Sequence, residues 1–418
     1  MLIQPFRAIR PAAAIAREAS CLPYDVMNRA EALKMADGNP HSFLHVIRSE
    51  IDLDPMVDAY DRAVYQKAAE NLQYLIQKGT LIQDDQPAFY LYQQTMAGRS
   101  QLGIAACFSI DDYVNDRIKK HELTRPEKEN DRIRHFDACD AHTEPVFLTH
   151  RSNASLTGFL QELTMKEPPE YDFTTEDGIG HSLWIVNDSS DVERIQTIFN
   201  EEIPSLYIAD GHHRSASSAK IGMQRRAQQK DLDANDPSQF FMAVSFPQED
   251  LLIMEYNRVV KDLNALSPEE LIIRLEAHFE CQPVNEAYQP QEKHTFGMLI
   301  DNQWYALKAK PHTYDAEDVI SQLDVSILQN WLLQPILGIS DPRTDQRIDF
   351  VGGIRGIGEL EKRVQTDMSL AFSLFPTTIE DLLQVADEQK IMPPKSTWFE
   401  PKLRSGLFVH SLKQSARK

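Results

Sequence analysis

The stretch SLYIADGHHRSASSAK, residues 205–220, decides how the middle of the chain folds. The apolar run from Leu206 to Ala209 predicts a buried strand, and Gly211 permits a sharp turn directly after it. The small residues from Ser215 onward are typical of the start of a helix. The sequence therefore predicts a strand, a turn and a helix in immediate succession, with a run of polar side chains at the junction.

This junction has the chemistry of a phosphate-binding site. The free N–H groups of a helix N-terminus and the positive end of its dipole attract phosphate, and the guanidinium of Arg214 can hold two phosphate oxygens in a fork. His212 and His213 can donate hydrogen bonds to further oxygens. The residues that we expect to bind phosphate here are Asp210, Gly211, His212, His213, Arg214 and Ser215.

The same residues also have a purely structural interpretation. Asp210 can cap the helix, the histidines can lie on the surface, and Arg214 can pair with a carboxylate. One such residue alone would favour that interpretation, but five consecutive polar or flexible residues directly after a buried strand favour function. A metal site is less favoured, because adjacent helical side chains diverge and no H-E-x-x-H spacing occurs.

A second charged segment, KKHELTRPEKENDRIRH, covers residues 119–135. Its cations stand out in an acidic chain, but acids are interleaved with them, so an ion-paired loop is an equally good interpretation of the spacing. A transferring polyphosphate needs cations from more than one element, which favours function. The cations that we expect to neutralise phosphate charge are Lys119, Lys120, Arg125 and Arg132.

Two carboxylates are candidates for the general base of a phosphoryl transfer. Asp25 follows a proline turn in PYDV, residues 23–26, and Glu122 lies in the cationic segment. Such a base must come within hydrogen-bond reach of the acceptor hydroxyl, whereas helix capping is the structural alternative for Asp25. The glycine-rich residues 352–358 are a weaker candidate, since they lack the G-K-[ST] ending of a P-loop and fit a packing turn.

The composition is that of an ordinary globular protein. Hydrophobic residues form 42% and charged residues 25% of the 418 residues, and this length favours two domains. The formal net charge of −20 disfavours a general nucleic-acid-binding role, so any anion site must be local. The four cysteines are dispersed and form no C-x-x-C pair, which indicates neither a disulfide framework nor a structural zinc site.

We expect a cytoplasmic protein without a membrane segment. The N-terminal sequence MLIQPFRAIRP lacks the apolar core of a signal peptide. The most apolar window, from Leu102 to Ile110, is about half as long as a membrane-spanning helix and predicts a buried strand.

Helices and strands are predicted along the whole chain, which indicates a mixed α/β fold. The expected elements include a hairpin of strands over 103–110 and 114–118, a helix over 316–337, and a helix that Ser267 caps. The chain has no low-complexity linker. From secondary structure alone, the predicted division is a catalytic region over 1–262 and a C-terminal α/β region over 263–418.

Motifs along nearly the whole chain resemble those of the bacterial family catalogued as domain of unknown function 1015. They are PFRAIRP (5–11), PYDV (23–26), NPHSFLHVIR (39–48), KKHELTRPEK (119–128), ADGHHRSAS (209–217), FVGGIRG (350–356) and MPPKSTWFEPKL (392–403). The D-G-H-H-R box also resembles the G-x-x-R phosphate-binding box of the ParB and sulfiredoxin-like fold. The resemblance implies such a phosphate-binding core, with a large insertion between Val26 and Ala209.

This family is similar to free L-serine kinases, which make O-phosphoserine with Mg²⁺ and either a nucleotide or inorganic pyrophosphate. The resemblance implies these substrates and this cofactor here. It places Asp210, His212, His213 and Arg214 in the phosphate-binding box, and Asp25 near the acidic residue that acts on the serine hydroxyl. The expected catalytic residues are Asp25, which the resemblance supports, together with Glu122 and His213.

Two related activities are disfavoured by departures from their patterns. A sulfiredoxin-type reaction needs a cysteine where His212 stands, and a ParB-type DNA-binding protein needs a helix-turn-helix and a basic face. The alternative to a serine kinase is a non-catalytic sensor of phosphometabolites or nucleotides that keeps the anion site. The sequence does not indicate an oligomeric state.

Overall fold

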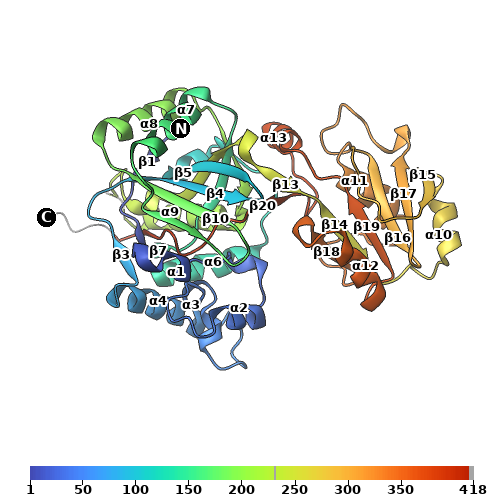
Figure 1. Ribbon diagram of the computed structural model, residues 1–418, viewed down its shortest axis with the longest axis horizontal. Helices are drawn as coiled ribbons and strands as arrows, with labels where there is room; N and C mark the ends of the chain where they lie inside the picture. The colour runs from blue at the N-terminus through green and yellow to red at the C-terminus, as the bar shows by residue number, and fades with distance from the viewer. Residues whose placement is uncertain (230–231, 414–418) are drawn as a thin grey trace. The chain divides into compact units, whose positions relative to one another are not determined.

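The computed structural model describes residues 1–229 and 232–413, which form two compact units (Figure 1). The first unit combines residues 1–251 with the segment from Pro401 onward, and the second comprises residues 252–400. Both units contain helices and strands, which confirms the predicted mixed α/β class.

The division of the chain differs from the predicted boundary after residue 262. Residues 252–260 form strands β13 (Leu252–Met254) and β14 (Tyr256–Val260), which pair only within the second unit among the described residues. The segment from Pro401 returns to the first unit, where β21 (His410–Ser411) pairs with β7 (Ala141–His142). Such long-range pairing leaves no local mark in the sequence.

A nine-stranded sheet forms the centre of the first unit. Eight strands follow the order β6, β11, β8, β12, β5, β4, β10 and β9, and β1 pairs with β5. Their bounds are β1 Ile3–Gln4, β4 Phe89–Met96, β5 Arg99–Ser109, β6 Ile118–Lys119, β8 Val146–His150, β9 Tyr171–Thr174, β10 Gly180–Val186, β11 Leu206–Asp210 and β12 Phe240–Pro247. The apolar window that begins at Leu102 is thus a strand inside a sheet.

Helices cover this sheet and build a second core beside it (Figure 1). Their bounds are α1 Ala16–Ala19, α2 Arg29–Ala36, α3 Leu44–Ile47, α4 Arg62–Gln77, α5 Ile110–Val114, α6 Pro126–Cys139, α7 Ala154–Lys166, α8 Ser189–Glu201 and α9 His212–Gln228. Phe159 of α7 and Phe199 of α8 share a core with Phe108 and Leu148 of the sheet. The hydrophobic effect of this burial holds the sheet and the two helices together.

The second core lies among α2, α3 and α4 and contains Phe43, Leu72 and Val409. Val409 arrives with the C-terminal segment, and its backbone pairs with Ile9 beside β2 (Ile9–Pro11), which itself pairs with β3 (Leu81–Gln83). Residues 401–413 therefore belong to the fold of the first unit.

The second unit is built on a six-stranded sheet in the order β15, β17, β16, β19, β14 and β18, and β13 pairs separately with β20. The further bounds are β15 Phe279–Val284, β16 Thr295–Ile300, β17 Gln303–Ala309, β18 Ile348–Gly352, β19 Leu370–Leu374, β20 Trp398–Glu400, α10 Pro268–Leu275, α11 Asp324–Leu328, α12 Ile357–Thr366 and α13 Ile379–Asp387. Ser267 caps α10 with a capping box, which confirms the predicted helix start.

The predicted hairpin of strands 103–110 and 114–118 is wrong. The side chain of Ser109 accepts a hydrogen bond from the Asp111 N–H and caps the short helix α5. β5 instead forms a hairpin with β4, through a turn in which Ala97 and Gly98 both have positive φ.

The predicted helix over 316–337 is also wrong for most of its length. Only residues 324–328 are α-helical, and residues 329–333 continue as a π-helical turn. Before them, the side chains of Asp315 and Asp318 accept hydrogen bonds from the N–H groups of Glu317 and Ile320. Such local bonds from aspartate compete with helix formation.

The glycine-rich stretch 352–358 is a packing turn, as the sequence suggested. A Cβ atom at Gly352 would lie 2.6 Å from the ring of Trp398, and one at Gly353 would lie 2.6 Å from the Glu255 carboxyl group. The absence of a side chain at these two positions therefore serves close packing within the second unit.

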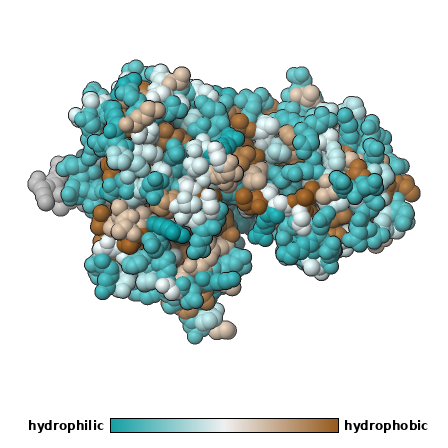
Figure 2. Space-filling model, viewed as in Figure 1, coloured by the Kyte–Doolittle hydropathy of each residue, from teal (hydrophilic) through white to brown (hydrophobic). Residues whose placement is uncertain are grey.

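Hydrophilic residues cover most of the molecular face seen in Figure 2, in keeping with the acidic composition. Among the described residues, no helix combines the length and the apolar character that crossing a membrane requires.

We predict that Gly103→Ala lowers the free energy of unfolding by about 1–3 kcal/mol, because overpacking forces its neighbours to shift. The added Cβ would lie 2.6 Å from the buried ring of Phe246 on the adjacent strand β12. Urea unfolding followed by circular dichroism measures the change. The control is Gly158→Ala in α7, where an added Cβ meets nothing within 4 Å. This variant should not lower the free energy of unfolding. Equal losses in both variants would contradict the packing.

Candidate functional site

The strand, turn and helix predicted around residue 210 are present. β11 is paired on both sides, with β6 and β8, but it lies next to the sheet edge and not centrally. Gly211 has φ +99°, a left-handed conformation that favours glycine, and α9 begins at His212 rather than at the predicted Ser215. Because the N-cap is glycine, no side chain caps the helix, and the first-turn N–H groups remain suited to an anion.

Arg214 lies on this first turn and is almost completely buried, with 2% of its surface exposed. Its Nη1 donates to the carbonyl of Pro145, and its Nη2 is 3.9 Å from the Asp210 carboxylate. Its Nε is buried and has no hydrogen-bond partner within the described part of the chain. Burial lowers the pKa of Arg214, but the charges of Asp210 and Asp25 outweigh this and raise it, so the guanidinium stays charged.

Asp210, the residue before Gly211, is ionised next to Arg214. Its side chain is 27% exposed, and its Oδ2 lies 3.3 Å from the Nζ of Lys402. Burial raises the pKa of Asp210, but the charges of Lys402 and Arg214 outweigh this and hold the pKa well below its usual range. Lys402 lies in the motif MPPKSTWFEPKL, residues 392–403, to which the sequence analysis assigned no chemical role.

Asp25 reaches the site from the N-terminal part of the chain. It lies exposed in a short helical turn, Tyr24–Val26. The N–H of the preceding residue, Tyr24, donates to Glu144, and the carbonyl of Pro145, the residue after Glu144, accepts from Arg214, so the turn that carries Asp25 lies near the start of α9. The charge of Asp25 also acts on the pKa of Arg214 and on that of His213. The PYDV motif and the ADGHHR motif therefore meet in the fold.

A buried carboxylate, Glu144, fixes the turn that carries Asp25. It accepts hydrogen bonds from the Tyr24 N–H at 3.2 Å and from the Ser405 Oγ at 3.0 Å, and Arg132 Nη1 lies 3.3 Å away. Burial raises the pKa of Glu144 in spite of the neighbouring charge of Arg132. Sequence reasoning missed this residue, although a carboxylate two residues before the apolar strand β8 was a signal for it.

Arg132 does not have the predicted role of a phosphate-neutralising cation. It is buried, its Nη2 lies 2.8 Å from Asp131, and its other bond goes to Glu144. Its guanidinium also lies over the Tyr24 ring, 3.9 Å from the centroid. Two carboxylates already balance its charge, so Arg132 positions Tyr24 and Glu144.

The segment 119–135 does lie against the ADGHHR motif, as predicted. β6 pairs in parallel with β11, and α6 packs on α9, where Ser217 Oγ donates to the Glu129 carbonyl at 2.9 Å. The segment is thus a strand, a loop and a helix, and the loop interpretation is wrong for residues 126–135, which belong to α6.

The three other cations predicted to neutralise phosphate charge, Lys119, Lys120 and Arg125, each have a different environment. Lys120 pairs with Asp116 at 2.7 Å and lies over the Tyr113 ring, and Lys119 lies over the Tyr207 ring. Arg125 is exposed and contacts the motif through its backbone. Ser215, also predicted to bind phosphate, is fully buried, and its Oγ donates within the helix to the carbonyl of Gly211 or His212.

The two histidines of the motif accept backbone hydrogen bonds. His212 Nε2 accepts from the His121 N–H at 3.4 Å, and His213 Nε2 accepts from the Arg125 N–H at 3.0 Å. Burial lowers the pKa of both, so they are neutral at pH 7. A neutral ring whose Nε2 accepts must carry its proton on Nδ1, so each histidine can donate at Nδ1 and cannot take up a proton there. This geometry disagrees with a general-base role for His213.

Glu122 lies near the second ring nitrogen of His212, the one that makes no bond to His121. Its Oε2 is 3.9 Å from His212 Nδ1, the atom that carries the proton in this tautomer. The carboxylate can therefore orient the imidazole. Together, the described contacts bring Asp25, the cationic segment, the ADGHHR motif and Lys402 into one site.

Comparisons with known proteins place the chain in a family. Residues 3–326 match the family described as "Protein of unknown function (DUF1015)". No curated protein matches the chain.

Solved structures show distant similarity. A free serine kinase variant in complex with AMP is 14% identical over 71% of this chain and 87% of its own, with a TM-score of 0.37. A conserved hypothetical protein from Pyrococcus furiosus is 14% identical over 72% and 93%, with a TM-score of 0.34. SbnI with a C-terminal truncation, from Staphylococcus aureus, is 11% identical over 75% and 90%, with a TM-score of 0.39.

The burial of His121, whose ring lies edge-on to that of His212 with centroids 4.4 Å apart, predicts acid sensitivity. Burial lowers the pKa of His121 to about 4 from an ordinary value of 6.5. A lowered pKa means that the unfolded state gains the proton first, so this stability is present above pH 6.5 and is lost as the pH falls toward 4. At pH 5 the loss from His121 is about 2 kcal/mol.

Urea unfolding at pH 7 and pH 5 measures this loss. The His121→Asn variant keeps a polar group that does not titrate in this range, so the difference between its two stabilities should be smaller than in the wild type. An equal or larger difference in the variant would contradict the assignment.

Proposed function

The chain belongs to the DUF1015 family, and we propose that it is a phosphotransferase that moves a phosphoryl group from inorganic pyrophosphate, or from a nucleotide, to the hydroxyl of free L-serine. The observation that carries the proposal is the charged, buried Arg214 on an uncapped helix start, 3.9 Å from the Asp210 carboxylate. Serine and pyrophosphate are chosen because the sequence motifs resemble those of free serine kinases.

The donor phosphate is held by donors on the first turn of α9. The backbone N–H groups there and the positive end of the helix dipole attract its oxygens. Arg214 keeps its positive charge on the same turn and attracts the phosphate. The Nδ1–H groups of His212 and His213 are additional donors. Fixed donors of this kind stabilise a transferring phosphoryl group because they need no reorganisation during the reaction.

The site also fits Mg²⁺, although the described residues contain no group of three or more side chains able to hold a metal ion. Magnesium typically binds one or two carboxylates and completes its shell with phosphate oxygens and water. Asp210, whose pKa is held low, would hold it. The ion would supply positive charge to the donor oxygens.

Asp25 is the better candidate for the base. Its exposed carboxylate lies beside the α9 turn, and the Glu144 contact fixes the backbone next to it. The proton of the serine hydroxyl would pass to this carboxylate as the oxygen attacks the phosphorus. Glu122 remains the second candidate, although its position beside His212 Nδ1 favours an orienting role.

We predict that Arg214→Lys folds but loses activity by about 100-fold or more, because lysine keeps the charge and cannot copy the planar fork. Phosphoserine formation measures activity, and thermal melting with and without pyrophosphate and Mg²⁺ measures donor binding, since a ligand stabilises the state that binds it. The donor should raise the Tm of the wild type and not that of the variant. Arg62→Lys, at an exposed position, is the control. A fully active Arg214→Lys protein would rule out the role.

We predict that Asp25→Asn lowers kcat by about 100- to 10,000-fold and leaves donor binding nearly unchanged, because the amide keeps the shape and cannot accept the proton. Asp85→Asn, an exposed change elsewhere, should have no effect. A near-normal rate in Asp25→Asn would transfer the role to Glu122. A sensor without catalysis would bind pyrophosphate in both variants and form no phosphoserine even as wild type.

A further inference from the structure

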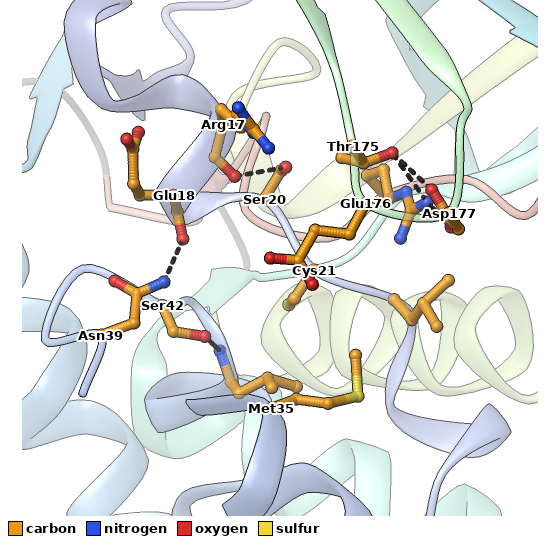
Figure 3. Close-up of a pocket in the computed structure, with 13 residues that line it drawn as sticks. Arg17, Glu18, Ser20, Cys21, Met35, Asn39, Ser42, Thr175, Glu176 and Asp177 are labelled. Carbon is orange, nitrogen blue, oxygen red and sulfur yellow. Dashed lines mark hydrogen bonds and ion pairs between the residues drawn. The ribbon is translucent and has the colours of Figure 1, made fainter. Parts of the chain in front are cut away.

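A pocket of about 520 Å³ opens in the first unit, apart from the residues of the candidate site (Figure 3). Four segments line it: residues 17–22 at the end of α1, residues 35–44 between α2 and α3, the hairpin turn 175–177, and Arg404. Neither Asp25 nor any residue of the ADGHHR motif takes part in the lining. Its volume is in the range of small-molecule sites, roughly 300–1,000 Å³.

The charges in this pocket disfavour a phosphorylated ligand. Arg404 is buried, with 5% of its side chain exposed, and it forms an ion pair with Asp177. Glu18 and Glu176 are exposed, and Figure 3 shows the Glu176 side chain extending into the pocket. The lining thus contains three carboxylates and only two guanidinium groups, the second from Arg17. A polyanion would be repelled on balance.

The same charges fit a zwitterion. Glu176 offers a carboxylate to an ammonium group, and the exposed Arg17 offers a guanidinium to a carboxylate. The Arg404 guanidinium adds a second positive charge to the lining, next to Asp177. Charge-assisted hydrogen bonds of both signs are the means by which proteins recognise a free amino acid's two charged groups.

An apolar wall completes the pocket. Leu22, Met35 and Leu44 contribute to the lining together with the thiol of Cys21. Met35 is 46% exposed although it is a large hydrophobic residue, and methionine adapts its shape to a ligand. This wall gives an apolar side chain of a ligand a surface on which to be buried.

We propose that this pocket binds a free α-amino acid with an apolar side chain, at a site separate from the one that binds phosphate. The proposal goes beyond the phosphotransferase function and does not depend on it. Glu176 holds the ammonium group, Arg17 and Arg404 face the carboxylate, and the wall of Leu22, Met35 and Leu44 contacts the side chain.

The backbone bridge between Cys21 and Ser405 separates the pocket from the candidate site. The Cys21 N–H donates to the Ser405 carbonyl at 3.0 Å, and the Ser405 N–H donates to the Cys21 carbonyl at 2.9 Å. Arg404 lines the pocket, whereas the next side chain, Ser405, donates to Glu144 in the candidate site. Neighbouring side chains of this segment thus serve the two sites.

Isothermal titration calorimetry of the full-length protein with L-leucine tests the proposal. Two analogues are matched controls: isoamylamine lacks the carboxylate, and isocaproate lacks the ammonium group. We expect leucine to bind and each analogue to bind at least about tenfold more weakly, since each loses a charge-assisted hydrogen bond. No binding of leucine at millimolar concentration would overturn the proposal. Isoamylamine binding as tightly as leucine would also overturn it, because the pocket would then be a simple cation site.

Three variants assign the binding to this pocket. Glu176→Gln should weaken leucine binding by about tenfold or more, because the amide cannot pair with the ammonium group. Glu162→Gln, an exposed change in α7, and Asp25→Asn should leave it unchanged. Wild-type affinity in Glu176→Gln, or a loss in Asp25→Asn as large as that in Glu176→Gln, would overturn the proposal.

Discussion

The burial of the Arg214 guanidinium is the constraint on which the rest of the candidate site depends. An unpaired charge in a protein interior is strongly destabilising, so a buried arginine requires carboxylates and carbonyls around it. Asp210 and the Pro145 carbonyl meet this need directly, and the charge of Asp25 contributes. Lys402 in turn pairs with Asp210, which connects the segment after the second unit to the middle of the chain.

A second buried network of hydrogen bonds and ion pairs fixes the turn Tyr24–Val26 near this site. Glu144 bonds to the Tyr24 backbone, to Ser405 and to Arg132, and Arg132 stacks on the Tyr24 ring. Removing one partner of such a network would leave another charge uncompensated. The turn that presents Asp25 therefore has its place set by buried groups, while the Asp25 carboxylate itself stays exposed.

Local sequence was enough to predict the parts of the site that depend on neighbours in the chain. The buried strand, the turn at Gly211 and the following helix were all predicted, because apolar runs and a glycine act over a few residues. Proximity of the segment 119–135 to the motif was predicted from chemistry and is present. Arg132 and Ser215 do not have the environment that was predicted for phosphate-binding residues. Arg132 pairs with Asp131 and Glu144, and Ser215 bonds to its own helix backbone, and the spacing of residues reveals neither kind of partner. Lys402 and Glu144 were missed, since their contacts join segments far apart in the chain.

The central claim is that this cluster holds a phosphoryl group in transit to an alcohol. Phosphorus NMR of the purified full-length protein with L-serine, Mg²⁺ and inorganic pyrophosphate tests it most directly, with a nucleoside di- or triphosphate in parallel samples. A phosphomonoester signal of O-phosphoserine should grow as the donor signal decays, and only when serine, Mg²⁺ and protein are all present. A donor signal that stays constant in every sample, or donor decay that yields only inorganic phosphate, would contradict the claim.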